Sequence, residues 1–151
     1  GSGCRRRASG WRRQFVRELF SFDYAIVRVV PRVERGEFLN TGIILFCSTQ
    51  AFLDARLQLD RGRLASIAPD IDCTMVESYL EVIARVCAGG DGAGPIGSLS
   101  QRERFHWLVA PRSTIIQTSP VHSGVDHDLP AALQKLFDKL VRSPQAPNDL
   151  P

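Results

Sequence analysis

Two groups of polar side chains in this 151-residue chain have the chemistry to bind a ligand or take part in catalysis. The first comprises Arg28, Arg35, Glu37 and Asn40, within or beside two apolar segments rich in β-branched residues. A buried guanidinium is always charged and carries five donors, so it needs a carboxylate, carbonyls or an anionic ligand. Glu37 has the chemistry of a general base, and Asn40 that of a group that orients a substrate. These residues fit an anion-binding site.

Each member of this first group also has a structural explanation. Arg28 lies mid-strand in an apolar segment, where it would form a buried ion pair with Glu37 or another acid if it does not anchor a ligand. Asn40 and Gly42 share one face of the next segment, where a missing side chain admits either a small ligand or a neighbouring backbone. The sequence leaves both explanations open.

The second group combines an arginine, two hydroxyls, an amide and an imidazole: Arg112, Ser113, Gln117, Ser119 and His122. Such groups bind phosphate or support acid–base chemistry, because histidine titrates near neutral pH. Serine and histidine three residues apart do not form a nucleophile pair unless a hydrogen bond joins them. Capping and turn stabilisation explain this group about as well.

Metal and cofactor signatures are not found in the sequence. His122, Asp126, His127 and Asp128 have the right chemistry for a metal, but their spacing matches no established ligand pattern and Asp128 is placed to cap a helix. The glycine-rich nucleotide loops, HExxH and GxSxG are absent. We therefore expect neither a metal nor a cofactor, and we assign no catalytic residue.

Four apolar segments predict the strands that must position these groups. They are residues 22–30, 38–47, 53–59 and 114–118. The third alternates apolar and polar residues, which is typical of an outer strand with one face in water. Residues 33–37 predict a hairpin connection, and residues 119–124 predict a turn.

Capping residues predict four helices in the same domain. Asp60, Ser100 and Asp128 precede three of them, and Ser100 and Glu103 have capping-box spacing. The longest helix is expected to start around Asp72 and Thr74, with Thr74 and Glu77 as a second capping box, and to stop at Gly89–Gly90. Its expected apolar stripe is Val76, Tyr79, Leu80, Ile83 and Cys87. Strands followed mostly by helices predict an α+β fold, an antiparallel meander of about four strands with helices mainly on one face.

The net charge of +3 is unevenly distributed along the chain. Residues 1–17 carry six arginines and no acid, which leaves 13 basic and 16 acidic residues in the remainder. Attraction to nucleic acid is therefore expected only from this arm. Residues 11–20 predict a basic amphipathic helix, which either packs on its own domain or binds a membrane, a partner or nucleic acid. We expect a basic arm over 1–21, one α+β domain over 22–143 and a disordered tail over 144–151.

The cysteines indicate a reducing environment. None of the four forms a short paired spacing, and Cys47, Cys73 and Cys87 lie in apolar surroundings that suit buried thiols. No apolar run approaches the length of a membrane span or a signal-peptide core. The expected location is the cytoplasm.

The segments Tyr24 to Pro31 and Arg35 to Gly42 resemble the bacterial family catalogued as domain of unknown function 3037. Further segments fit the same pattern: Pro69 to Asp72, Ala88 to Gly90, Gly94 to Gly97, Glu103 to Phe105 and Ala110 to Gly124. The resemblance implies a small bacterial cytoplasmic protein without an established activity, and it suggests gene neighbours similar to HipA-like serine/threonine kinases. Family members often carry a cysteine where this chain has Val125 and Asp126, so a thiol mechanism is not expected here.

Three functions are consistent with these observations. The preferred one is a non-enzymatic module that binds a partner or ligand, with a HipA-like kinase as a candidate partner. The second is a small enzyme for a phosphate-bearing substrate, with Arg28 and Arg112 as anion clamps, Glu37 or His122 as base and Asn40 orienting the substrate. The third is nucleic-acid binding through the arginine-rich arm. The observation that would discriminate best among these functions is whether the two polar groups meet in one pocket or are used in hydrogen bonds and ion pairs within the protein.

Overall fold

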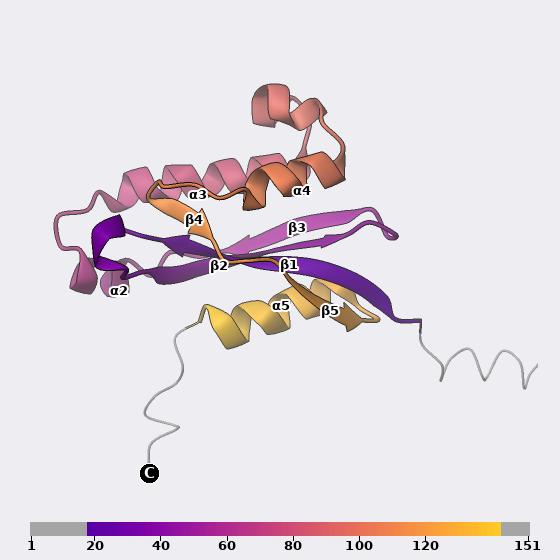
Figure 1. Ribbon diagram of the computed structural model, residues 1–151, viewed down its shortest axis with the longest axis horizontal. Coiled ribbons are helices and arrows are strands. Elements are labelled where there is room, and N and C mark those ends of the chain that lie inside the picture. The colour runs from indigo at the N-terminus through magenta and orange to yellow at the C-terminus, as the bar shows by residue number, and fades with distance from the viewer. Residues whose placement is uncertain (1–17, 143–151) are drawn as a thin grey trace, which may run out of the picture.

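A computed structural model describes residues 18–142, and its core is an antiparallel sheet (Figure 1). The strands are β1 (Phe20–Val29), β2 (Leu39–Cys47), β3 (Phe52–Leu57), β4 (Ile116–Thr118) and β5 (His122–Asp126). Their order is β3-β2-β1-β4, and β5 also pairs with β1. The predicted α+β fold is confirmed, and β3 is an outer strand as expected. Five strands occupy four positions because β4 and β5 share one edge of β1.

Strands β1 and β2 are central because both of their faces are apolar. In β1, Val27 and Val29 point to one face of the sheet and Phe22 and Ile26 to the other. Strand β2 is almost completely buried from Leu39 to Cys47. Strand β1 begins two residues before the predicted position, so the helix predicted over residues 11–20 is wrong at Phe20; residues 11–17 lie outside the described part of the chain.

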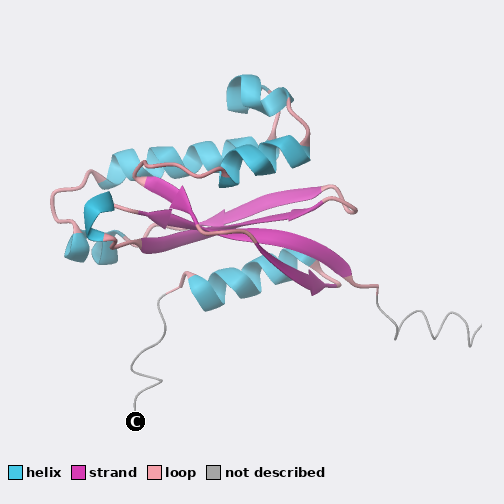
Figure 2. Cartoon of the chain, viewed as in Figure 1, coloured by secondary structure: helices cyan, strands magenta, loops and turns pink. Residues whose placement is uncertain are grey.

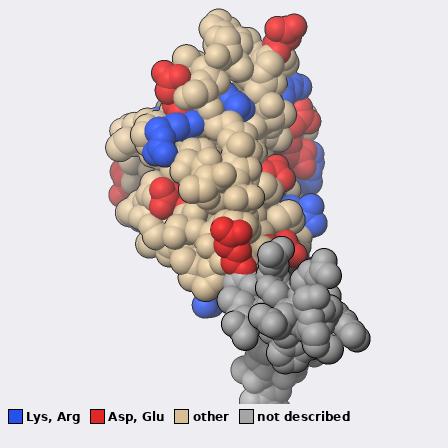
Figure 3. Space-filling view, turned by 90° about the vertical axis from the view of Figure 1, so that its right-hand side faces the viewer, with Lys and Arg blue, Asp and Glu red and all other residues tan. Residues whose placement is uncertain are grey.

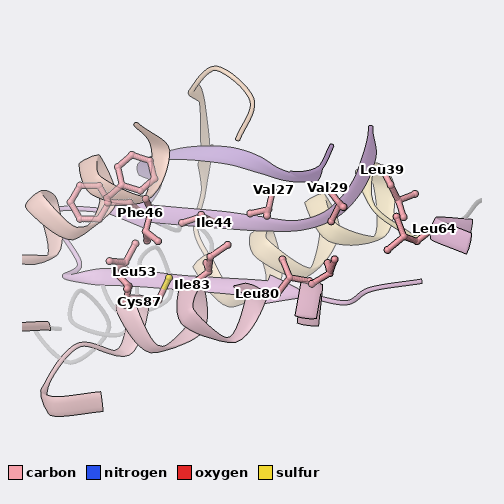
Figure 4. Packing of buried hydrophobic residues seen from close by; sticks show 14 residues of the cluster. Val27, Val29, Leu39, Ile44, Phe46, Leu53, Leu64, Leu80, Ile83 and Cys87 are labelled. Carbon is pink, nitrogen blue, oxygen red and sulfur yellow. The ribbon is translucent and has the colours of Figure 1, made fainter. Parts of the chain in front are cut away.

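Helices cover both faces of the sheet (Figure 2). They are α2 (Arg61–Ile67), α3 (Cys73–Ala88), α4 (Gln101–Val109) and α5 (Leu129–Leu140). Helices α3 and α4 lie on one face and α5 on the other, so most helical residues are on one face, as predicted, and α5 supplies a further layer. In the larger core, shown in Figure 4, Ile44 and Phe46 pack with Leu80 and Ile83.

Local capping determines where the helices begin. The carboxylates of Asp60, Asp72 and Asp128 each accept backbone N–H groups of the following turn, and Ser100 and Glu103 form the predicted capping box. The capping box predicted for Thr74 and Glu77 is wrong. Asp72 already takes the N–H groups of the first turn of α3, and the Glu77 carboxylate pairs with Arg61 of α2.

The turn predicted over residues 119–124 is wrong, because these residues continue along β1. Val27 pairs with Thr118 in β4 and Tyr24 with His122 in β5, so the register shifts by one residue between the two strands. The Ser119 hydroxyl, which is 2% exposed, accepts the Ile26 N–H at 2.9 Å and joins the two ladders at this shift. Pairing with a strand about 100 residues away overrides the local turn preference of the Ser-Pro sequence.

The segment that follows α3 is ordered. A 3-10 segment, η2 (Asp91–Ser98), follows the predicted stop at Gly89, whose φ is +76°. Arg104 is buried and donates to the carbonyl oxygens of Val86, Cys87 and Leu99, which closes the carboxyl end of α3. No sequence pattern around Arg104 indicates that this arginine is internal.

Candidate functional site

The hairpin turn, residues 30–38, holds the most conspicuous charges of the first polar group. It contains η1 (Val33–Arg35) and Gly36 at φ +69°, the left-handed conformation that glycine favours. The Arg35 Nε donates to Glu37 Oε1 at 2.6 Å, and both side chains are about half exposed. Glu37 is therefore paired within the turn, and the alternative of an ion pair between Arg28 and Glu37 is wrong.

Arg28 and Asn40 lie opposite each other on the face that α5 covers. The Arg28 guanidinium stacks over the Phe38 ring at 4.2 Å, and its buried Nε has no hydrogen-bond acceptor among residues 18–142. The Asn40 amide donates to the carbonyl oxygen of Leu140 at 3.0 Å, which ties β2 to the end of α5. The buried Asn40 Oδ1 likewise has no hydrogen-bond donor among residues 18–142, so stacking and one backbone bond occupy only part of each side chain.

Gly42 serves the close approach of a neighbouring strand. A Cβ atom at this position would lie 2.7 Å from the backbone oxygen of Arg56 in β3. Gly42 also pairs with Val27 beside the irregularity between Val27 and Arg28. The missing side chain therefore makes room for the backbone of β3 rather than for a small ligand.

The second polar group is divided among several structural contacts. Ser119 joins the two ladders, and the Gln117 amide donates to the Thr114 carbonyl oxygen at 2.9 Å. Ser113 is exposed. His122 is exposed and its ring lies 5.4 Å from that of Tyr24. Ser119 and His122 are not hydrogen-bonded to each other within the described residues.

Arg112 closes the carboxyl end of α4. Its guanidinium donates to the carbonyl oxygens of Trp107 and Leu108 and stacks over the Trp107 ring at 4.6 Å. It lies on the α3 and α4 side of the sheet, whereas Arg28 faces α5. The two arginines therefore do not clamp one anion.

Glu37 and His122 are also separated. His122 pairs with Tyr24 in the first half of β1, and Glu37 lies past its last residue, Val29. At about 3.3 Å per residue this distance is on the order of 20 Å, too far for joint acid–base chemistry on one small substrate. The arrangement considered for a phosphate-acting enzyme is not assembled in the described part of the chain.

A mainly apolar hollow lies between α3, α4 and β4, and we call it the groove. Its volume is about 480 Å³. Its lining comprises Tyr79, Val82, Ile83, Trp107, Leu108, Arg112 and residues 114–118. Of the two polar groups, only Arg112 and Gln117 line it. Among the described lining residues Arg112 alone is charged, so the groove is an apolar site with one cation.

An exposed apolar stripe of α3 extends this groove. Met75, Tyr79 and Val82 follow helical spacing and are 37%, 44% and 40% exposed, and Trp107 of α4 is 37% exposed. The prediction that Tyr79 belongs to the buried stripe is wrong, because the core side of α3 is formed by Val76, Leu80, Ile83, Val86 and Cys87. Helix α3 thus has a buried and an exposed apolar stripe. Met75 and Val82, as apolar residues outside the predicted stripe, were the sequence signal for the exposed one.

The titratable groups of the described chain do not form a second site. Burial raises the pKa of the Cys87 thiol to about 12, so this thiol stays protonated and is a poor nucleophile. Among residues 18–142, no group of three or more His, Cys, Asp or Glu is arranged to hold a metal. Basic and acidic groups are interspersed on the face shown in Figure 3, without a patch of one sign. The arginine-rich arm lies outside the described residues.

The fold and the groove define an α+β protein with a sheet covered on both faces and an open apolar surface. The chain belongs to the family described as Protein of unknown function (DUF3037), whose model matches residues 24–141. The matched range includes every element of the groove. Comparison with curated proteins and with solved structures gave no match. None of the described helices is long and apolar enough to cross a membrane.

Proposed function

We propose that this protein is a non-enzymatic binding module whose groove receives an apolar segment of a partner protein. The observation that carries this proposal is the exposed stripe of Met75, Tyr79 and Val82, of which Tyr79 and Val82 line the groove together with Trp107. Exposed apolar side chains gathered beside a hollow are typical of an interaction surface.

Covering this surface would contribute favourable free energy to a complex. Tyr79 and Trp107 each have about two fifths of their surface in water. Burying the remainder of one such aromatic ring contributes about 2 kcal/mol. Arg112 and Gln117, at the polar margin of the groove, supply donors that orient the partner. These two residues are the part of the predicted polar groups that we retain in the site.

A HipA-like kinase in a bacterial cytoplasm is the first partner that we propose to test. The family resemblance suggests this neighbour, and the groove offers the surface on which an apolar segment of such a protein would dock. Strand β4 pairs with Val27–Val29, next to the hairpin turn, but the charges of Arg35 and Glu37 are already paired with each other, so we expect the complex not to use them.

A binding experiment with two matched variants tests the proposal. A HipA-like kinase is immobilised, and the wild type, Val82→Asp and the double variant Arg35→Ala/Glu37→Ala are compared by biolayer interferometry. We expect micromolar or tighter binding of the wild type and of the double variant, and at least a tenfold loss for Val82→Asp. Equal binding of all three would overturn the groove as the site, and no binding of the wild type would overturn the kinase as partner.

A further inference from the structure

Strand β4 borders the groove and has a free edge. The N–H of Val30 donates to the Ile115 oxygen at 2.7 Å, and the N–H of Ser119 donates to the Ile26 oxygen at 2.8 Å. In an antiparallel ladder these bonds alternate along the strand, so the backbone of Gln117 faces β1. The backbone groups of the two flanking residues, Ile116 and Thr118, therefore point away from the sheet.

The outward donors of β4 have no partner in the described chain. The carbonyl oxygen of Ile116 accepts the Thr114 hydroxyl at 2.8 Å, but the N–H groups of Ile116 and Thr118 have no acceptor among residues 18–142. The opposite edge of the sheet, β3, carries Asp54 and Arg56, charges that discourage pairing with another strand. Strand β4 reads Ile-Gln-Thr and carries no such charge.

We propose, building on the binding function above, that the occupant of the groove is an extended partner segment that pairs with β4 as an additional strand. Strand addition uses the free backbone donors for affinity and pockets for alternate side chains for selectivity. The groove supplies these pockets on the α3 and α4 side of the new strand. The apolar side chains of the segment enter between Val82 and Trp107.

The charge of the groove specifies the chemistry of the segment further. Arg112 is its only charged lining residue, and no described acid lines it. A carboxylate on the incoming strand would meet this guanidinium at the margin of the groove. The segment is therefore extended, apolar at alternate positions and acidic at one of them.

A second copy of the chain fits this edge less well. Two-fold pairing of β4 with its counterpart would bring two Arg112 side chains to one interface whose described lining holds no acid. Like charges without a counter-ion oppose such a dimer. A partner segment of complementary charge avoids this repulsion.

The proposal is tested by selecting peptides that bind the full chain from a library of random decapeptides displayed on phage. Peptides selected on the wild type are measured against Thr118→Pro, Thr118→Val and Trp107→Ala. Thr118→Pro removes an outward N–H that the sheet does not use, and Pro is tolerated at such edge positions. Thr118→Val is the matched control, because both substitutions remove the hydroxyl that donates to the Val109 oxygen at 3.3 Å.

Strand addition predicts at least a tenfold loss of peptide affinity for Thr118→Pro, wild-type affinity for Thr118→Val, and Asp or Glu enriched in the selected peptides. It also predicts that the Ile116 and Thr118 amides become protected from hydrogen exchange on binding, while Gln117 changes little. Peptides that lose affinity for Trp107→Ala but not for Thr118→Pro would overturn strand addition and leave the binding function standing. Failure to select any peptide would overturn both proposals, and a dimer that Thr118→Pro dissociates would replace the partner segment with a second copy.

Discussion

The hairpin turn and the groove differ in how completely their side chains are already bonded within the protein. In the turn, the charges of Arg35 and Glu37 neutralise each other and Arg28 stacks on Phe38. In the groove, Tyr79, Val82 and Trp107 remain more than a third exposed and no described residue covers them. Polar residues attract attention in a sequence because they are chemically versatile, but an unfilled binding capacity belongs to the side chains that the fold leaves uncovered.

The largest expected effect separates the two regions by binding. Val82→Asp places a charge on the wall of the groove, which must be desolvated when a partner covers it. We expect about a 100-fold loss of partner affinity, which corresponds to about 2.7 kcal/mol, with little change in unfolding free energy because Val82 is 40% exposed. Isothermal titration calorimetry and urea denaturation measure the two quantities. If the variant instead unfolds at a clearly lower urea concentration than the wild type, Val82 contributes to the core.

Gly42→Ala, in the hairpin strands, is expected to give the opposite result: lower stability with unchanged partner affinity. The new methyl group would lie 2.7 Å from the Arg56 backbone oxygen, so β2 and β3 must move apart. We expect the free energy of unfolding to fall by about 2 kcal/mol, while the folded protein binds its partner as the wild type does. Thermal unfolding followed by binding measurements at low temperature checks this. A loss of affinity in the folded variant would connect the hairpin with the groove.

Ser119→Ala tests whether Ser119, a member of the second polar group, has a structural role. The substitution leaves the buried Ile26 N–H without its acceptor, and we expect a loss of about 1.5 kcal/mol of unfolding free energy. Ser113→Ala is the matched control, because Ser113 is exposed, and should change stability by less than about 0.5 kcal/mol. Equal effects of the two substitutions in urea titrations would contradict the role of Ser119 in joining β4 and β5.

The smallest effect is expected from removing the ion pair of the hairpin turn. Arg35→Ala/Glu37→Ala should alter the free energy of unfolding by less than about 0.5 kcal/mol, because both side chains are about half exposed and the pair is screened by water. Partner affinity should also remain within about twofold of the wild type. A marked loss of affinity would show that this turn, rather than the groove alone, contacts the partner.

Local signals made much of the fold predictable. Asp60, Ser100 and Asp128 cap their helices through bonds to residues three positions away, so the sequence contains both partners of each contact. Strand β5 was missed because its pairing with β1 depends on residues about 100 positions apart, whereas Pro120 and Gly124 carry the local signature of a turn.

The candidate site was less predictable for a related reason. Tyr79 has apolar character and helical spacing, so it resembles a core residue until the neighbours of α3 are known. Its exposure depends on how far α4 and β4 extend over that helix, which no pattern within α3 records. Conversely, the hydrogen bond of Asn40 to Leu140 and the stacking of Arg28 on Phe38 are tertiary contacts that give these polar residues a structural role, although one buried polar atom of each has no partner among residues 18–142.

The one-residue register shift at Pro120 divides one side of β1 into two ladders that can open separately. Strand β4 contributes three residue pairs and β5 five, and Ser119 is the bond between them. Short ladders of this kind can open locally as separate units. A local opening of β4, the strand that borders the groove, therefore need not open β5.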